Sequence, residues 1–514
     1  MKAFLMYRDR DFYQQADLPP NAADLTQDLE LTTLFSAMAA GDEFLLEVAK
    51  DAVLTCLHEP EEILYRQNVM ADCLERAEIV RELYGIAVEA VEREKRIWGW
   101  LSKYPDSMLR RSIEVLQLFV DLVKQFRRMS EEHGAKFRSE GFVRFFKMLA
   151  TELDDAYLSS VEEHLIRLGF RDGLVMSAEL GKGNKGTHYI LRKLPQVNRK
   201  WTERFQMWWE KLIQKDGSSY VYEIADRDEA GFRALSELKA RGISHVAIAL
   251  AQATDHILSF FTMLRTELGF YIGCLNLRER LARKSEVICF PLPFPPGTAK
   301  LSSKGLYDIC LSLTMEGNVI ANDVSGDDKL LVMITGANRG GKSTFLRSIG
   351  LAQLMMQSGM FVAAESFSAN VHDGVFTHFK REEDVSMRSG KLDEELSRMN
   401  AIVEKMKPVS VVLLNESFAS TNEREGSEIA RQIVHALLEM GIKVFYVTHL
   451  FDLAHSFYLA KTKEALFLRT ERLADGQRTF RLVEGEPLPT SFGEDLYRRI
   501  FQTPSRVAVE SASV

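Results

Sequence analysis

The chain has 514 residues, of which 46% are hydrophobic and 27% are charged. This length predicts roughly two to four domains, and this composition is that of an ordinary globular protein, which excludes a disordered one. The formal net charge of −8 excludes a chain that attracts nucleic acid over its whole surface, so any DNA-binding surface has to be local and basic.

Cysteine usage and hydropathy predict the compartment in which the protein works. The cysteines have no paired spacing, which argues against a zinc site; they are Cys56, Cys73, Cys274, Cys289 and Cys310. Together with the absence of a signal peptide, they predict the reducing cytoplasm. Because no uninterrupted apolar run reaches the roughly 18 residues of a membrane helix, we expect a soluble protein without membrane contact.

Residues 1–285 are predicted to form a mainly helical core and lever domain. From Asp106 onward, apolar residues recur at spacings of three and four, as on one face of an amphipathic helix: Leu109, Ile113, Leu116, Val120 and Val123. A longer apolar stripe covers residues 228–281, and Gly242 within it is expected to bend the helix or to split it in two. Packing in a core explains both stripes.

A glycine-rich turn at residues 181–186 lies between two strand-like runs and predicts a β-hairpin. The surrounding region, residues 173–204, is basic and carries Tyr189 and Trp201. Lysines on a flexible turn can reach phosphates and release counterions, which is the chemistry of sequence-independent DNA binding. The candidate DNA-binding residues are Lys182, Lys185, Arg192, Lys193, Arg199 and Lys200. A solvated hairpin with ordinary surface lysines explains the same residues equally well.

The predicted secondary structure changes after this helical part. The segment 286–304 is expected to be an irregular linker, because it contains Pro291, Pro293, Pro295 and Pro296. Short strands and helices then alternate, which predicts an α/β domain over residues 305–500. The last residues, 501–514, are expected to form a loose tail.

The strongest signal is "GANRGGKS", which follows a predicted buried strand at residues 330–334 and has the spacing of a P-loop. Its glycines allow backbone N–H groups to turn around phosphate oxygens, and the helix that begins at Lys342 directs the positive end of its dipole at the same anion. Lys342 is expected to contact the β- and γ-phosphates of ATP, and the Ser343 hydroxyl is expected to bind Mg²⁺.

Two further strand ends complete the predicted site. The apolar run at residues 409–414 ends in Asn415 and Glu416, and Glu416 is placed to orient or deprotonate the attacking water. A third run, residues 444–447, leads to His449, a candidate sensor of the γ-phosphate. For an isolated histidine, a structural role would be the alternative.

Three segments, "TGANRGGKSTFLRSIGLAQLMMQSGMF", "VVLLNESFASTNEREG" and "VFYVTH", together resemble the ATPase domain of the MutS family of DNA mismatch-repair proteins. The similarity covers roughly residues 306–493. It implies an ABC-type P-loop ATPase domain, ATP and Mg²⁺ as cofactors, and double-stranded DNA as the ligand. Upstream, "HEPEEILYRQNVMADCLE" resembles the start of the family's helical core, and the long helix after Asp228 resembles its lever.

The resemblance also assigns roles residue by residue. Glu416 matches the catalytic carboxylate and His449 matches the switch histidine. In the family a serine of the partner subunit completes each ATP site, and "EDVSMRSGKLDEELSRM" occupies the corresponding place, which nominates Ser389 and implies a homodimer. The predicted nucleotide-binding residues are Gly336, Asn338, Gly340, Gly341, Lys342, Ser343, Thr344 and Ser389, with Ser343 and Asn415 at the metal.

Four departures from the family are expected to matter. Asn415 stands where the family usually has Asp; its amide keeps an oxygen but loses the charge, which predicts weaker Mg²⁺ affinity and slower turnover. Val319, in "VIANDV", stands where members often stack an aromatic ring on adenine. The mismatch-reading N-terminal domain is expected to be absent. The segment "RDFYQQ" has only a superficial similarity to its Phe-x-Glu wedge, because Gln14 stands in place of the acid, and we interpret the match as a coincidence. A C-terminal nuclease-like appendage is also expected to be absent.

The leading hypothesis is a dimeric, ATP-gated DNA-binding protein that closes on mismatched, branched or distorted duplexes in repair or recombination. A nucleotide-dependent binding switch with negligible hydrolysis is the first alternative, and Asn415 motivates it. A protein-interaction scaffold that never contacts DNA is the second, and it suits the acidic net charge.

Overall fold

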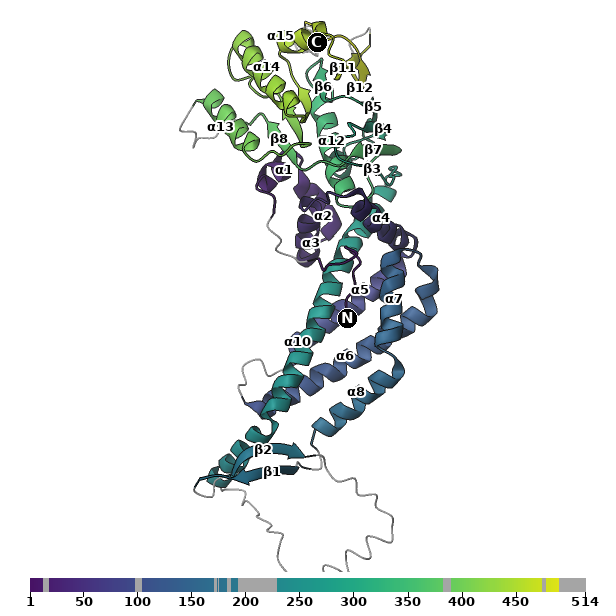
Figure 1. Cartoon of the computed structure of the whole chain (residues 1–514). Coiled ribbons are helices and arrows are strands. Elements are labelled where there is room, and N and C mark those ends of the chain that lie inside the picture. Colours follow the sequence, from purple (N-terminus) through teal and green to yellow (C-terminus); the bar gives the residue numbers. More distant parts are fainter. Residues whose placement is uncertain are drawn as a thin grey trace, which may run out of the picture. The chain divides into compact units, whose positions relative to one another are not determined.

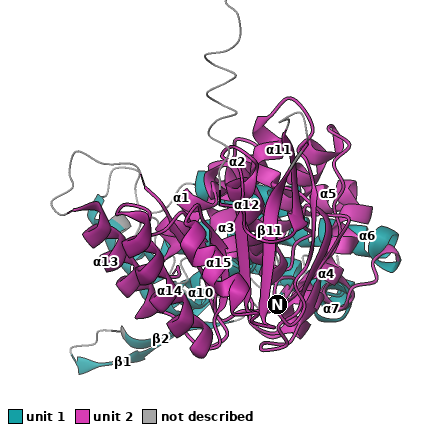
Figure 2. Ribbon diagram, turned by 90° about the horizontal axis from the view of Figure 1, so that it is seen from above, with its two compact units in different colours: residues 1–2, 85–135, 146–264 teal, residues 3–84, 136–145, 265–514 magenta. Residues whose placement is uncertain are grey.

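The computed structural model describes residues 1–12, 18–97, 104–170, 173, 175–182, 186–192, 229–381, 390–473 and 478–489 (Figure 1). The chain divides into two compact units, each assembled from several stretches of sequence (Figure 2). Unit 1 comprises Met1–Lys2, Gly85–Ala135 and Phe146–Leu264; unit 2 comprises Ala3–Tyr84, Lys136–Phe145 and Arg265–Val514. Unit 2 therefore combines residues from both sides of the predicted linker.

In its described residues, unit 1 is made of helices and one hairpin. The glycine-rich turn joins two antiparallel strands, β1 (Val175–Leu180) and β2 (Gly186–Arg192), as the sequence predicts. The helices are α5 (Ala77–Arg96), α6 (Pro105–His133), α7 (Glu140–Glu152), α8 (Asp155–Leu168) and α10 (Glu229–Ala282), with a 3₁₀ turn at Gly134–Lys136; α5, α7 and α10 continue into unit 2. The apolar stripe predicted after Asp106 is the buried face of α6.

Gly242 lies inside α10, which continues through it, so the expectation of two separate helices is wrong. A Cβ atom at this position would lie 1.8 Å from the Sδ atom of Met176 on β1. The glycine thus permits the hairpin to pack closely against the helix instead of interrupting it.

By length and composition, α10 between Arg233 and Ala282 meets the criterion for a membrane-spanning helix, with a mean hydropathy of 1.3 in its most apolar window. The sequence search missed it because it required an uninterrupted apolar run, whereas this criterion tolerates isolated charges. Only 22% of that window is buried within the structure. Core helices of soluble proteins meet the same criterion, so length and hydropathy alone do not assign α10 to a membrane.

Unit 2 is built around a six-stranded sheet in the order β12-β11-β6-β10-β9-β8, in which only β12 runs antiparallel. The strands are β6 (Leu331–Thr335), β8 (Val375–Phe379), β9 (Val411–Asn415), β10 (Lys443–Val447), β11 (Ala465–Arg472) and β12 (Arg478–Glu484). Each residue of β6 and β10 is buried, as expected for parallel strands covered on both faces. The three strands predicted from apolar runs are therefore confirmed, with small shifts at their ends.

Helices cover both faces of this sheet. One face packs against α13 (Lys391–Val403), α14 (Glu423–Glu439) and α15 (Phe451–Leu459). On the other face, α12 (Lys342–Gln357) packs against Leu413 and Phe445. The N-terminal part of unit 2 adds α1 (Ala22–Asp28), α2 (Leu31–Ala39), α3 (Glu43–Leu54) and α4 (Pro60–Glu75). These helices bond directly to the C-terminal part, for example through Asn21 Nδ2, which donates to Val375 O at 2.6 Å.

The prediction of an irregular linker at residues 286–304 is wrong, because β3 (Leu292–Phe294) and the start of β4 (Leu301–Leu306) lie within it. Both strands belong to a second sheet with the order β3-β7-β4-β5, which also contains β5 (Asn322–Ser325) and β7 (Ser366–Asn370). A short helix, α11 (Ile309–Thr314), follows β4. Pro293 is tolerated because β3 is an edge strand, where a residue without an N–H leaves no ladder bond unmade on the outer side.

The N-terminal segment of unit 2 is attached to α10 through a buried carboxyl group. Glu267 is fully buried and accepts the N–H groups of Leu5 (2.7 Å) and Phe12 (3.4 Å). Burial raises the pKa of Glu267 to about 7, although these hydrogen bonds oppose the shift.

We expect the folded chain to lose stability as pH rises from about 4.5 to about 7, because the folded state then holds a proton on Glu267 that the unfolded state has released. The contribution is on the order of 3 kcal/mol. Thermal unfolding followed across this range should show a flatter pH dependence for Glu267→Gln than for the wild type. Parallel curves for the two proteins would contradict the assignment.

Candidate nucleotide-binding site

The predicted site residues follow three neighbouring parallel strands. Val447, at the end of β10, pairs with Ile334 on β6 and with Asn415 on β9, so the loops after these strands leave the same edge of the sheet. Backbone hydrogen bonds hold the starts of these loops side by side: Glu416 N donates to Val447 O at 2.8 Å, and Thr448 N donates to Ile334 O at 3.1 Å. The structure thereby brings together three sequence motifs that are far apart in the chain.

The loop 336–341 between β6 and α12 has the backbone of a phosphate cradle. Gly336 and Gly341 have φ angles of +115° and +92°, which favour glycine. A Cβ atom at Gly336 would lie 2.2 Å from the Thr470 Oγ1 atom, and one at Gly340 would lie 2.7 Å from the Thr470 Cγ2 atom. Thr470 on β11 also accepts the Ala337 N–H at 2.9 Å. The loop is therefore seated on a residue that the sequence did not indicate.

Lys342 is the first residue of α12 and is only 5% exposed. Its Nζ atom donates to Gly336 O at 2.9 Å and to Ala337 O at 3.0 Å, so the ammonium group lies inside the curve of the loop. Burial lowers the pKa of Lys342 to about 8, while the charge of Glu416 opposes this shift. Asn338 is exposed at the turn of the loop.

This pKa predicts a pH-dependent affinity for ATP. Above about pH 8 the free lysine is neutral and must take up a proton to pair with a phosphate, so affinity should fall by up to about tenfold per pH unit. Calorimetric titrations at about pH 7 and about pH 9, in buffers of different ionisation enthalpy, would measure both the affinity and the proton uptake. Lys342→Arg should bind without this pH dependence, since a guanidinium does not titrate here.

Two neutral oxygens lie side by side where the metal is predicted. The Ser343 hydroxyl donates to Asn415 Oδ1 at 2.9 Å, and Ser343 is exposed. Oxygen donors suit Mg²⁺, which usually keeps several waters and relies on phosphate oxygens. Among the residues that the structure describes, no group of three or more His, Cys, Asp or Glu side chains is placed to hold a metal. The donors therefore fit an Mg²⁺ ion that arrives with a triphosphate.

Glu416 and His449 form a pair, with 2.6 Å between Oε1 and Nε2. Each is partly exposed at 28% of its side chain. The hydrogen bond from His449 lowers the pKa of Glu416, against the effect of burial, so the carboxylate is ionised at neutral pH. His449 also lines a polar cavity of about 180 Å³ together with Gly336 and Glu423. Glu416, an ionised carboxylate bonded to this histidine, can accept a proton from water.

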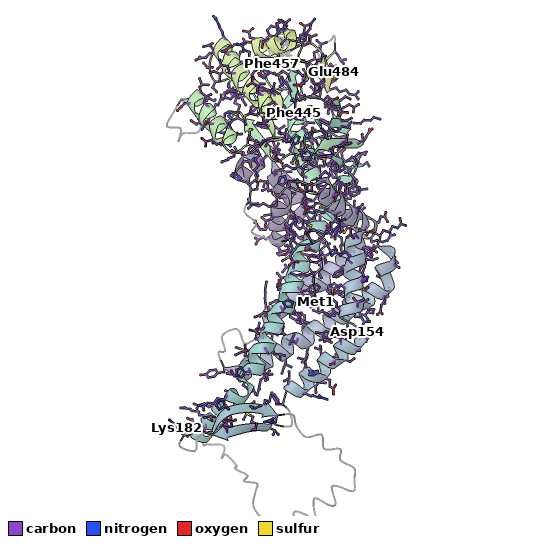
Figure 3. The ribbon with its side chains drawn as sticks, in the orientation of Figure 1. Met1, Asp154, Lys182, Phe445, Phe457 and Glu484 are labelled. Carbon is purple, nitrogen blue, oxygen red and sulfur yellow. The ribbon has the colours of Figure 1, made fainter. Side chains whose placement is uncertain are left out.

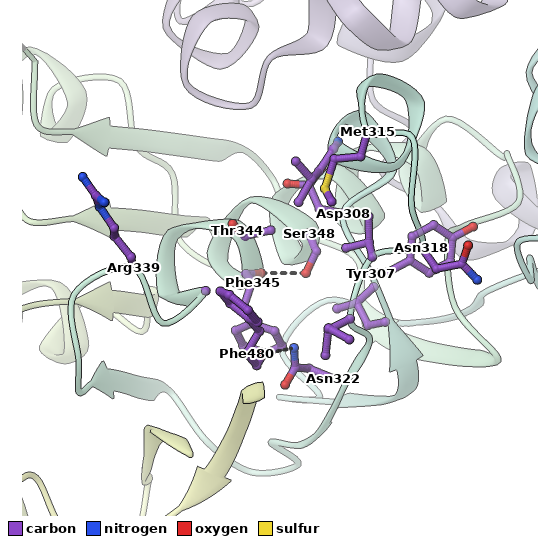
Figure 4. Close-up of a pocket in the computed structure, with 15 residues that line it drawn as sticks. Tyr307, Asp308, Met315, Asn318, Asn322, Arg339, Thr344, Phe345, Ser348 and Phe480 are labelled. Carbon is purple, nitrogen blue, oxygen red and sulfur yellow. Dashed lines mark hydrogen bonds between the residues drawn. The ribbon is translucent and has the colours of Figure 1, made fainter. Parts of the chain in front are cut away.

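A second cavity, of about 350 Å³, adjoins the loop at Arg339 and Gly341 (Figure 4). Its lining includes Val319, Tyr307 and Thr344, and Phe480 from β12 supplies an aromatic ring that the sequence analysis missed. The carbonyl of Phe480 accepts a bond from Asn322 Nδ2 at 3.2 Å, which ties β12 to β5. The Arg339 side chain points away from this cavity (Figure 4).

The structure describes only some of the predicted DNA-binding residues. Lys182 is exposed at the loop end of the hairpin (Figure 3), and Arg192 is exposed on β2 with its Nε atom 2.9 Å from Ser177 Oγ. The remaining candidates, Lys185, Lys193, Arg199 and Lys200, lie outside the described residues, as do Gln14 and Ser389.

Two family models match this chain. That of the MutS2 N-terminal domain matches residues 58–284, and that of MutS domain V matches residues 332–513, the part that contains the site. The chain belongs to the MutS family. The first of these models covers the chain from α4 through α10, so the helical part shares the relationship.

Three relatives illustrate this membership. An Endonuclease MutS2 of Lacticaseibacillus casei (strain BL23) is 33% identical over 258 residues, 49% of this chain and 32% of that protein. The MutS protein homolog 4 of Homo sapiens is 26% identical over 293 residues, 55% of this chain and 30% of that protein. A DNA mismatch repair protein MutS of Thermotoga sp. (strain RQ2) is 37% identical over 137 residues, 26% of this chain and 17% of that protein. The matched part of this chain thus spans less than a third of each of these three relatives.

Proposed function

We propose that this chain binds and hydrolyses ATP at the loop 336–343, and that the ATP cycle gates a dimeric clamp on mismatched, branched or otherwise distorted DNA. The observation that carries the proposal is the convergence of Lys342, Ser343 and the Glu416–His449 pair at one edge of the sheet. A phosphate cradle without a base would serve binding alone, whereas an ionised carboxylate beside it supports hydrolysis.

The proposed roles follow from the geometry. Lys342 exchanges its bonds to the loop carbonyls for bonds to the β- and γ-phosphates, and Ser343 with Asn415 holds the magnesium side of the triphosphate. Bound Mg²⁺ would neutralise charge on the phosphate oxygens. Glu416 accepts the proton of the attacking water, and His449, hydrogen-bonded to it, holds that carboxylate in place.

The apolar cavity is proposed to hold the base. It adjoins Gly341 and Thr344 at the start of α12. Phe480 supplies an aromatic ring to its wall, whereas this chain has Val319 where family members often place one. An adenine that stacks on Phe480 would place its triphosphate toward the loop. Phe480→Ala should weaken ATP binding more than triphosphate binding, because only the base loses its stacking partner.

DNA binding is proposed to use the hairpin of unit 1. Its exposed Lys182 and Arg192 carry positive charge, and the MutS relatives include proteins named for DNA mismatch repair. Closure would require a homodimer in which Ser389 of one subunit completes the site of the other. We place this activity in the cytoplasm.

A DNA-binding panel tests the proposal. Fluorescence anisotropy with homoduplex, mismatched and four-way DNA, each with and without ATP, should show tighter binding to the distorted substrates and a change on adding ATP. Replacing Lys182 and Arg192 with Ala should weaken binding to every DNA alike, because phosphate contacts do not read sequence. Indifference to all three DNAs at low salt would contradict the proposal and favour a protein-interaction scaffold.

The pair of Ser343 and Asn415 favours a second candidate, a nucleotide-dependent switch with negligible hydrolysis. With an amide in place of a carboxylate, the metal side of the site is neutral. Steady-state phosphate release decides between the two. A wild-type rate above that of Glu416→Ala, together with an Asn415→Asp rate above that of the wild type, would support slow hydrolysis. Equal rates for the wild type and Glu416→Ala would support the switch.

A further inference from the structure

A fully buried polar network begins at the residue after Glu416. Its members are Ser417, His378 on β8, Tyr446 on β10 and Glu395 on α13, none more than 1% exposed. The Tyr446 hydroxyl donates to Ser417 O at 2.6 Å. The Ser417 Oγ atom lies 2.7 Å from His378 Nδ1 and 2.8 Å from His378 O. Both the backbone and the side chain of Ser417 are therefore held.

The protonation state of His378 follows from its partners. Burial lowers the pKa of His378 to about 4, so the ring is neutral at physiological pH and carries one N–H. Its Nε2 atom lies 3.0 Å from the Glu395 carbonyl, which can only accept, so the proton is on Nε2. Nδ1 and the His378 carbonyl oxygen are then both acceptors for the Ser417 hydroxyl, which shares its one proton between them.

The network surrounds a strained stretch of backbone. Glu416 and Phe418 have φ angles of +54° and +62°, which side-chain-bearing residues rarely adopt. Phe418 is buried against the His378 ring, with centroids 5.4 Å apart and planes at 19°. Such a backbone persists only where its surroundings hold it, and these contacts with Ser417 and Phe418 do so.

The same histidine connects this stretch to α13. Its Nε2–H donates to the Glu395 carbonyl, and the Glu395 carboxylate accepts the Ser420 hydroxyl at 2.7 Å. The loop after β9 is thus attached to β8 at Ser417 and to α13 at Ser420.

We propose that His378 is the positioning residue of Glu416: through Nδ1 and Ser417 it fixes the strained backbone that aims the carboxylate, and through Nε2 it connects that backbone to α13. This inference rests on the proposed ATP hydrolysis. His378 is itself fully buried, with its ring enclosed by Ser417, Phe418 and Glu395, so it acts on the site only through these neighbours.

Two substitutions separate the two ring nitrogens. The Asn amide oxygen can take the place of Nδ1, so His378→Asn keeps a side-chain acceptor for the Ser417 hydroxyl and loses the hydrogen bond to the Glu395 carbonyl. The Gln amide nitrogen can take the place of Nε2, so His378→Gln keeps the hydrogen bond to the Glu395 carbonyl and loses the side-chain acceptor for the Ser417 hydroxyl. We expect His378→Gln to lower kcat for ATP hydrolysis at least about tenfold with KM nearly unchanged, and His378→Asn to restore most of it.

His372 provides a matched control. It is also buried with its pKa lowered to about 4, and its Nδ1 atom lies 2.9 Å from Val409 O, but it precedes β8 at the opposite edge of the sheet. His372→Gln should cost comparable stability and leave kcat unchanged. Ser417→Ala should lower kcat at least as much as His378→Gln does, because it removes the hydroxyl from both Nδ1 and the backbone carbonyl of residue 378. The double variant should be no slower than Ser417→Ala, because that substitution already removes the bond that His378→Gln loses. Tyr446→Phe offers a milder test that preserves volume.

Hydrogen–deuterium exchange of unliganded protein reports positioning without catalysis. The Glu416 amide donates to Val447 O, and peptides containing residues 416–418 should exchange faster in His378→Gln but not in His372→Gln. Equal kcat and equal exchange in these two variants would overturn the inference. If wild type released phosphate no faster than Glu416→Ala, the proposed function would fail, and the exchange comparison would still decide whether His378 holds this backbone.

Discussion

Lys342→Met is expected to weaken ATP binding by at least about a hundredfold. The ammonium group lies inside the curve of the loop 336–341, and it would make charge-assisted bonds to two phosphates, each on the order of 1.5–3 kcal/mol. Met keeps the length of the side chain and removes only the charge and its donors. Titration with a fluorescent ATP analogue would measure the loss.

Lys443 supplies the control for that experiment. It is 3% exposed on β10, burial lowers its pKa to about 8, and its Nζ atom has no hydrogen-bond partner among the described residues. Lys443→Met should therefore bind ATP as the wild type does, and it should not be less stable, because it removes an unpaired buried amine. If Lys342→Met kept full affinity, the triphosphate would not lie in this loop.

Glu416→Gln is expected to lower the rate of ATP hydrolysis by about 10²–10⁴-fold while ATP affinity stays nearly constant. The amide keeps the shape of the side chain and can still bond to His449, but it cannot take a proton from water. Single-turnover measurements with saturating protein would report the chemical step without product release.

Glu423→Gln is the corresponding control. Glu423 lines the same polar cavity as His449, but its Oε1 atom accepts the Phe451 N–H at 3.1 Å, a bond that an amide oxygen can also accept. Its hydrolysis rate should match that of the wild type. A large loss in Glu423→Gln together with a small one in Glu416→Gln would move the general base to Glu423.

The sequence predicted the elements of the site whose signals are local. Continuous apolar runs marked the buried parallel strands, and the spacing of glycines before Lys342 marked the start of α12. The family resemblance marked Glu416 and His449, which the structure places 2.6 Å apart.

Features that depend on distant parts of the chain had no such signal. Thr470 and Phe480 lie in a hairpin far downstream, and only the register of β11 beside β6 brings Thr470 to the loop. Prolines suggested a linker where β3 forms an edge strand. The positions of prolines in a sequence do not reveal which strands lie at the edge of a sheet, where a proline is tolerated. The attachment of residues 3–84 to the C-terminal sheet was equally hidden, since its contacts span hundreds of residues.

The seat of the loop on Thr470 has a consequence for biosynthesis. Ala337 and Thr470 are separated by 133 positions, so a ribosome exposes the glycine-rich turn well before it makes the residue that supports it. At ordinary rates of translation, that interval is on the order of ten seconds. A nascent polypeptide should therefore become able to bind nucleotide late, only after strands β11 and β12 have left the ribosome and β11 has paired with β6.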